Sequence, residues 1–309
     1  MDAFVQVVEV WTLRSGVMRL HSGSYGRHHE FAEASESASF EFGEGLPGSV
    51  WSSRKPQIWE PLGEDFVRLE EARAAGLDAG VGIPISAGGR ETNAVVTLLC
   101  GSREKTGGCI ERWDVSESGR ELSHAGGYYG QLEAFARMSP LMRFPIGRGL
   151  PGMTLQSGLP TVIDDTRTSD TFLRGEVARE SGVEAGLGIP IYRDGKVAHV
   201  VVLLSTESTP LARAFEVWVP AESDRLRLQQ SFYARGLESF AEVSRNTRFR
   251  AGEGLPGMVY RTELPQVFGS LDAAPFVRHD AARAAGLQVG VGIPVSDGRN
   301  VRAVVVLLS

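Results

Sequence analysis

Cysteine, long apolar runs and excess positive charge are all scarce in this chain of 309 residues. Its two cysteines, Cys100 and Cys109, have no counterparts in the repeats of the chain, which argues against a disulfide framework, a zinc site or a redox pair. No apolar run approaches the roughly 18 residues that would span a bilayer, and the segment MDAFVQVVEVW lacks the basic and apolar regions of a signal peptide. We therefore expect a cytosolic protein with no membrane partner.

The charge balance excludes another class of partner. The formal net charge is −6, and no clustered basic face of the kind that binds DNA or RNA is apparent. Apolar residues make up 42% of the chain and charged residues 23%, a balance typical of globular proteins that bury a core. We expect a folded protein with no nucleic-acid partner.

The dominant feature that is present is an internal repeat. GEGLPGSV at 43–50 returns as GRGLPGMT at 147–154 and as GEGLPGMV at 252–259, with spacings of 104 and 105 residues. The segment VGIPIS returns as LGIPIY and VGIPVS, each followed by a β-branched run. Because a fixed period of this kind marks a repeated structural unit, we predict three modules, at residues 1–102, 103–207 and 208–309.

Each copy begins and ends with the pattern of a β-hairpin. EVWTLRSGVMRLHS has two apolar runs around a Ser-Gly turn, and GVGIPIS with AVVTLL forms a second pair of β-branched runs. Between the hairpins, two segments per copy have apolar positions at helical spacing, and the second ends at a glycine. These helical segments are residues 27–38 and 65–77 in the first copy, 130–141 and 171–183 in the second, and 235–246 and 275–287 in the third.

This order of elements predicts an α+β fold in each copy, an antiparallel sheet with helices on one face. The last strand is apolar without alternation, so both of its faces should be buried. Helices of the same copy cover one face. We expect neighbouring repeats or a second chain to cover the other.

The glycine-proline loop allows two interpretations. Backbone N–H groups ahead of a helix attract phosphate, but the loop lacks the Lys-Ser/Thr of a P-loop. We favour a structural role, in which the glycines supply special backbone angles and the proline starts a helix.

At GEGLPGSVW, FVR, GVGIPI and AVVTLL the sequence resembles a GAF domain, and the resemblance recurs in all three copies. It implies a GAF/PAS-like sheet with a small-molecule pocket between the sheet and the helices. Members of the family sense cyclic nucleotides, bilins, haem-bound gases, amino-acid-like ligands or oxoacids, or bind nothing and dimerise. The long helices that usually flank the domain are missing here, which argues against helix-borne signalling. No kinase, phosphatase, ATPase or DNA-binding segment is left outside the three modules, so we expect the output to come from a partner. Two cysteines cannot form the three-cysteine arrangement of GAF-type methionine sulfoxide reductases.

One set of polar residues recurs in every copy and forms our candidate ligand-binding site. Residues two apart on a strand point to one face, so the glutamate and tryptophan of the first hairpin project together. The arginine of the FVR or FLR segment then either pairs with the glutamate as a structural ion pair or grips a carboxylate-bearing ligand bidentately. The candidate residues are Glu9, Trp11 and Arg68, then Glu111, Trp113 and Arg174, then Glu216, Trp218 and Arg278.

The six histidines show no common position in the three copies. HHE at 28–30 is a poor metal motif because adjacent helical residues face different ways. Copy three places Gln229 where copies one and two place His21 and His124. No Ser, Cys or Lys stands in a recognisable motif beside a repeated histidine or acid, so we predict no catalysis and no metal.

The sequence therefore predicts a non-catalytic sensory or regulatory protein. Its three GAF-like modules bind a small ligand, an anionic one included, and signal through a partner protein or a homo-oligomer. The alternative is a ligand-free scaffold for interaction or oligomerisation. No cofactor is specified by the sequence.

Overall fold

The computed structural model describes residues 3–86, 91–272 and 275–309. Over these ranges the chain forms three antiparallel six-stranded sheets, one in each copy. The strand order is the same each time: β3-β2-β1-β6-β5-β4, β9-β8-β7-β12-β11-β10 and β15-β14-β13-β18-β17-β16. The predicted α+β class is confirmed. The sheets fall within residues 5–101, 107–206 and 214–308, and the module boundaries themselves stay a prediction.

The elements of module 1 are β1 (Val5–Arg14), β2 (Val17–Ser24), α1 (His29–Ser37), β3 (Ser39–Phe40), α2 (Gly45–Ser53), β4 (Gln57–Trp59), α3 (Leu69–Ala74), β5 (Leu77–Ile85) and β6 (Ala94–Gly101). Those of module 2 are β7 (Gly107–Val115), β8 (Glu121–Gly130), α4 (Glu133–Met138), η1 (Ser139–Leu141), β9 (Arg143–Pro145), α5 (Gly149–Ser157), β10 (Thr161–Ile163), α6 (Gly175–Ser181), β11 (Val183–Arg193) and β12 (Lys196–Thr206). Those of module 3 are β13 (Ala214–Ala221), η2 (Glu222–Asp224), β14 (Arg225–Tyr233), α7 (Glu238–Asn246), β15 (Arg248–Arg250), α8 (Gly254–Thr262), β16 (Gln266–Phe268), α9 (His279–Ala284), β17 (Gly290–Ser296) and β18 (Val301–Leu308).

The predicted hairpins and helices are all present. The first two strands of each copy pair antiparallel, as do the β-branched runs near its end, although the turn of the first closing hairpin lies partly outside the described residues. The glycine that ends the second predicted helix has a left-handed backbone in every copy, with φ of +68° at Gly76, +69° at Gly182 and +66° at Gly286. No helix in the described ranges is both long and apolar enough to cross a bilayer.

The glycine-proline loop has the structural role that we favoured. Gly45 has φ of +55°, which only glycine adopts easily. Gly43 and Gly48 donate their backbone N–H groups to the carbonyls of Gly48 and Glu44, so these groups are not directed at a ligand. The helix that follows packs directly on the sheet, because a Cβ atom on Gly82 of β5 would lie only 2.4 Å from Cγ2 of Val50.

Gly48 has no room for a side chain, and its replacement tests this turn. A Cβ atom there would lie 2.2 Å from the backbone oxygen of Glu41. We expect Gly48→Ala to lower the free energy of unfolding by about 1–3 kcal/mol or more. Gly63→Ala is the matched control, because no atom lies within 4 Å of its added Cβ. Urea denaturation measures both, and equal effects would contradict the packing described here.

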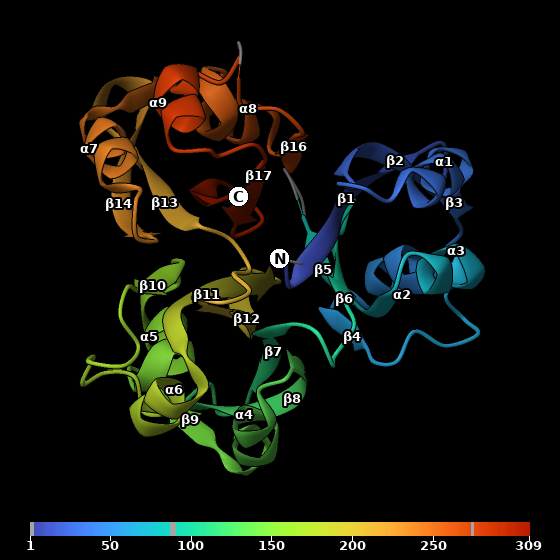
Figure 1. The fold of residues 1–309 in the computed structure, drawn as a ribbon, viewed down its shortest axis with the longest axis horizontal. Helices are drawn as coiled ribbons and strands as arrows, with labels where there is room; N and C mark the ends of the chain where they lie inside the picture. The colour runs from blue at the N-terminus through green and yellow to red at the C-terminus, as the bar shows by residue number, and fades with distance from the viewer. Residues whose placement is uncertain (1–2, 87–90, 273–274) are drawn as a thin grey trace.

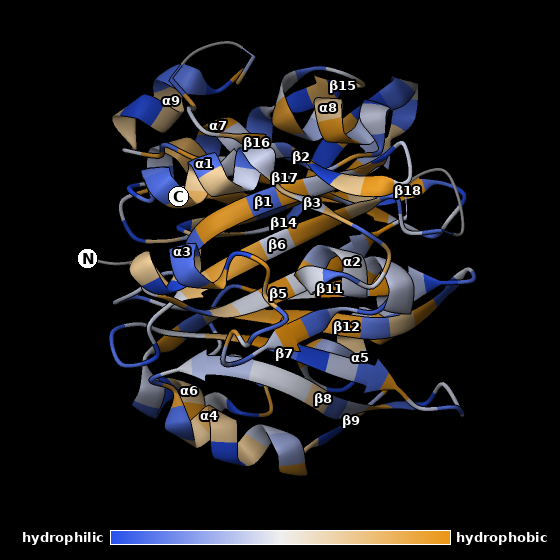
Figure 2. Ribbon diagram, turned by 90° about the vertical axis from the view of Figure 1, so that its right-hand side faces the viewer, coloured by the Kyte–Doolittle hydropathy of each residue, from blue (hydrophilic) through white to orange (hydrophobic). Residues whose placement is uncertain are grey.

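The second face of each sheet is covered by the other two modules. Buried residues of all three modules form one continuous hydrophobic cluster, which includes Val81 of β5, Leu187 of β11 and Ile293 of β17. The modules lie around a common centre with their helices outermost, and both termini lie near that centre (Figure 1). Apolar strands run through the interior of the molecule (Figure 2). The predicted burial of both faces of the last strand is confirmed, since every residue of β6 is buried, and neighbouring repeats provide the cover.

The modules contact one another head to tail, and the series closes on itself. Interface 1–2 joins β4 to β8, interface 2–3 joins β10 to β13 and β14, and interface 3–1 joins β16 to β1 and β2. Each interface therefore places an edge strand of one sheet (β4, β10 or β16) against the first hairpin of the next module. Repetition of one head-to-tail contact through a closing rotation gives a ring, so the chain has pseudo-threefold symmetry.

Candidate functional site

The structure brings the recurrent glutamate, tryptophan and arginine together in each module. Glu9 and Trp11 project from β1, while Arg68 immediately precedes α3. Arg68 Nη1 lies 2.5 Å from Glu9 Oε1, and its Nη2 lies 3.0 Å from Oε2. This is a bidentate ion pair, the first of our two interpretations of the arginine.

Modules 2 and 3 repeat this geometry closely. The Arg174–Glu111 distances are 2.6 and 2.9 Å, and the Arg278–Glu216 distances are 2.5 and 2.8 Å. Each glutamate also accepts a hydrogen bond from the indole N–H of its tryptophan, at 3.1, 3.0 and 2.9 Å in modules 1, 2 and 3. The pair thus ties the sheet to the helices on its outer face.

Aromatic rings surround each guanidinium. The Cζ atom of Arg68 lies 4.6–5.7 Å from the ring centroids of Phe31, Trp11, Phe66 and Phe40. Arg174 and Arg278 each lie over one tryptophan and three phenylalanines in the same way. Such contacts favour the charged form of arginine. The three arginines and three glutamates are at most 4% exposed.

The electrostatics of the pair favour charged glutamates despite burial. Desolvation alone would raise the pKa of the Glu111 carboxyl, but the charge and hydrogen bonds of Arg174 outweigh it and hold the pKa below its usual value. The pKa values of Glu9 and Glu216 are lowered for the same reasons. The glutamate of each pair is therefore ionised at neutral pH.

A serine and a tyrosine belong to the same network and were missed from the sequence. Ser35, Ser139 and Ser244 each accept a hydrogen bond from the arginine Nη1 of their module. The hydroxyls of Tyr25 and Tyr233 donate to Glu9 and Glu216. The signal was available, because both residue types recur at the 104–105 residue period of the chain: Ser35, Ser139 and Ser244, then Tyr25, Tyr129 and Tyr233.

One polar atom of each network has no partner among the described residues. The Nε atoms of Arg68, Arg174 and Arg278 are buried, and their N–H groups donate to no acceptor within the described ranges. Buried donors are usually satisfied by protein or water. The ligand-binding role of the nine recurrent residues stays a prediction, and this N–H is the part of the network through which it could operate.

The strand pairing corrects the proposed equivalence of three residues. His124 lies opposite Trp113, a position held by Leu20 in module 1 and Leu228 in module 3. His21 and Gln229 instead occupy the irregular step next to it. The prediction was wrong for His124 because the turns of the hairpins differ in length: they lie between the paired residues Arg14 and Val17 in module 1, Val115 and Leu122 in module 2, and Ala221 and Arg225 in module 3.

An acid–histidine pair lies in module 2. His199 Nδ1 lies 2.6 Å from Asp114 Oδ1, and Arg112 binds both oxygens of the same carboxylate at 2.7 and 2.6 Å. An acid that orients a histidine is one part of a general-base arrangement. The Nε2 atom of His199, however, is buried and has no hydrogen-bond partner among the described residues. The arrangement therefore lacks a bound nucleophile.

The two thiols are buried and unpaired. Desolvation raises the pKa of Cys100, and the nearby charge of Glu60 raises it further. Desolvation and Glu111 also raise the pKa of Cys109. Because the thiolate is the reactive form, neither cysteine has the character of a nucleophile. Within the described ranges, no group of three or more His, Cys, Asp and Glu side chains could hold a metal ion.

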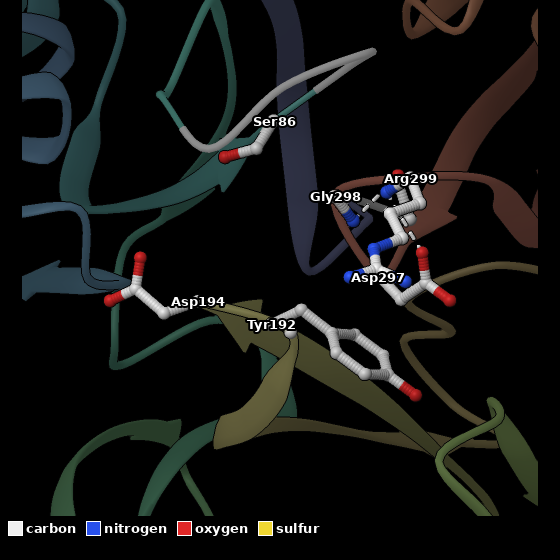
Figure 3. A pocket seen from close by; sticks show the side chains of 8 residues that line it. Ser86, Tyr192, Asp194, Asp297, Gly298 and Arg299 are labelled. Atoms are coloured by element: carbon white, nitrogen blue, oxygen red, sulfur yellow. Dashed lines mark hydrogen bonds between the residues drawn. The ribbon is translucent and has the colours of Figure 1, made fainter.

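A small polar pocket lies where equivalent strand ends of the three modules meet. Ser86, Tyr192 and Ser296 occupy the same position in their modules and line a cavity of about 80 Å³ together with Asp297 and Arg299. Figure 3 shows side chains from the three modules facing this space. Asp297 Oδ1 accepts the backbone N–H of Arg299 at 2.9 Å, so this carboxylate holds its own turn.

Comparison with known structures finds similarity to several proteins, three of which are described here. The GAF domain of nlh2 from A. aeolicus is 20% identical, covers 33% of this chain and 60% of its own, and has a TM-score of 0.27. The free methionine-R-sulfoxide reductase of Neisseria meningitidis is 22% identical over 31% of this chain and 51% of its own, with a TM-score of 0.25. NreA of Staphylococcus aureus, mutated in its nitrate binding site, is 14% identical. The match covers 32% of this chain and 74% of the NreA chain, with a TM-score of 0.26. The chain is similar to these proteins over about one module's length.

These similarities extend over about one module each and concern the fold alone. The aligned part spans 60% of the first of these chains and 51% of the second. No protein-family model matches this chain, and no curated protein matches it.

Proposed function

We propose that the chain is a non-catalytic regulatory protein whose three GAF-like modules form one platform for a partner protein. The Glu–Arg pair that fills the helical side of each sheet carries this proposal. A ligand in that space would have to displace a buried ion pair, and breaking such a pair costs about 3–5 kcal/mol. Recognition is therefore assigned to the outer surface.

An exposed apolar residue recurs on that surface in every module. Val67, Leu173 and Val277 immediately precede the paired arginines and are 54%, 50% and 48% exposed. Each lies beside the second glycine of the glycine-proline loop. Phe42 and Ile146, near the same loop in the sequence of modules 1 and 2, are 64% and 46% exposed. Exposed apolar groups that gather at one place favour contact with another protein.

Native mass spectrometry of the purified protein tests the proposal. We expect the native mass to equal the sequence mass or a multiple of it, with no molecule held at the arginines. Excess mass that is lost on denaturation, and that is absent from Arg68→Lys, Arg174→Lys and Arg278→Lys variants, would contradict the proposal. If Leu173→Asp breaks up an observed assembly, this exposed apolar residue is part of the contact.

A second candidate, a sensor of a small anion, is favoured by the unpartnered arginine Nε in each module. Nitrate is a suitable probe because it is a small planar anion, and the NreA structure is described as mutated in a nitrate binding site. In this case about 10 mM nitrate should raise the Tm above that in equal chloride, since a ligand that binds only the folded state stabilises it. The Arg174→Lys variant should lose part of the shift. Equal Tm values in the two salts would exclude this candidate.

A further inference from the structure

The three module interfaces are related by pseudo-symmetry but are not packed equally. One ladder position of the first hairpin faces the centre in every module. It holds Ile110 opposite Tyr128 in module 2 and Phe215 opposite Phe232 in module 3. In module 1 the same position holds Val8 opposite Ser24.

The large pairs fill interfaces 1–2 and 2–3. Tyr128 is fully buried, stacks on Phe4 of module 1 with ring centroids 5.4 Å apart, and donates its hydroxyl to the carbonyl of Gly101 at 2.6 Å. Phe215 and Phe232, whose centroids lie 5.6 Å apart, are 0% and 6% exposed. An aromatic side chain is thus the ordinary filling of this space.

Interface 3–1 has a cavity where the aromatic ring is missing. Its volume is about 160 Å³, and Val8, Ser24 and Leu98 of module 1 line it together with Val291 and Leu307 of module 3. Val291 and Leu307 form a cross-strand pair, as do Val81 with Leu98 and Leu187 with Leu203 beside the filled interfaces. This part of the wall is therefore equivalent at the three interfaces, and the small side chains of Val8 and Ser24 leave it uncovered at interface 3–1.

The lining defines the chemistry of an occupant. No described residue that lines the cavity has a charged side chain, and its walls are mainly valine and leucine. An apolar cavity of about 150 Å³ accepts benzene. Ser24, whose hydroxyl can donate and accept, and Gln6 also line the cavity.

We propose that the cavity between modules 3 and 1 is a binding site for a small neutral molecule with the dimensions of one aromatic ring and a hydroxyl group, of the phenol class. The ligand takes the place that Tyr128 and Phe232 occupy at the other two interfaces. This site lies on the central face of the sheet, away from the Glu–Arg pairs, so it is independent of the function proposed above. Its occupation would brace module 3 against module 1.

Phenol titration into the full chain tests the site. We expect one molecule per chain, with a Kd of roughly 0.1–1 mM, which is normal for a ligand of this size. The methyl NMR signals of Val8, Leu98, Val291 and Leu307 should shift on binding. Absence of saturable binding up to about 10 mM, or shifts confined to other methyl groups, would overturn the proposal.

Filling the cavity provides the second test. Ser24→Phe introduces the residue of module 3, and we expect it to weaken phenol binding by about tenfold or more while the Tm stays equal or rises. Val8→Phe, which copies Phe215, serves if Ser24→Phe does not fold. Ser118→Phe, in an exposed turn of module 2, is the matched control and should bind like the parent. Unchanged affinity in a folded Ser24→Phe or Val8→Phe variant would overturn the proposal.

Discussion

Arg174→Met lowers the free energy of unfolding by about 3–5 kcal/mol, because it leaves the carboxylate of Glu111 buried without its counter-charge. Glu111 is 0% exposed and keeps only the hydroxyl of Ser139 and the indole of Trp113 as hydrogen-bond donors in the described network. Urea denaturation followed by tryptophan fluorescence measures the loss. It should be one of the largest effects of any single substitution outside the central core.

Two further variants separate the ion pair from general effects of losing arginine. Arg137→Met removes an arginine that pairs with Glu133 on the surface of the same module, where the two side chains are 72% and 74% exposed. That change should cost no more than about 0.5 kcal/mol. The double variant Arg174→Met with Glu111→Leu should be more stable than Arg174→Met alone, since no unpaired charge is left. Equal costs for Arg174→Met and Arg137→Met would contradict the structural role of the pair.

The same pair predicts the direction of the pH dependence. The pKa of the Glu111 carboxyl is lower in the folded protein than its ordinary value of 4.5. The folded state therefore binds this proton less readily than the unfolded state, and the stabilisation is fully present above that ordinary value. It is lost as the pH falls through the folded pKa. In the Arg174→Met, Glu111→Leu variant, this part of the acid sensitivity should be absent.

Leu187→Asp is expected to abolish the native fold, with a cost of about 4–5 kcal/mol or more, because it places a carboxylate in the shared core. Leu187 lies on β11, is fully buried, and belongs to the cluster that joins the three modules. Leu141→Asp makes the same change at a position that is 83% exposed, and its effect should stay within about 0.5 kcal/mol.

The number of modules that lose structure in the Leu187→Asp variant distinguishes a shared core from independently folded modules. Hydrogen exchange measured by mass spectrometry reports on each module separately. We expect faster exchange in modules 1 and 3 as well as in module 2, because all three cover one another's sheets. Faster exchange in module 2 alone would show that the modules fold as independent units.

The candidate site was predictable in part. Glu9 and Trp11 two residues apart on a strand had to share a face, and the repetition of Arg68 at the same distance marked it as a third member. Sequence reasoning left open whether the arginine meets the glutamate or a ligand. That choice depends on how closely the helices pack on the sheet, as in the contact of Gly82 with Val50 of α2, and no local sequence pattern sets this distance.

The sequence by itself determined three α+β modules with the two hairpins and the helices found in each, because hairpin turns and glycine helix ends are local properties. It also indicated that the last strand of each module needs cover on both faces. It did not predict the short edge strands of each sheet, such as β3 and β4. Only the tertiary structure decided that the modules close into a ring and that interface 3–1 keeps a cavity. Both depend on which side chains meet across interfaces, as Val8 of module 1 and Val291 of module 3 do at the cavity. Residues so far apart in the chain are brought together by packing alone.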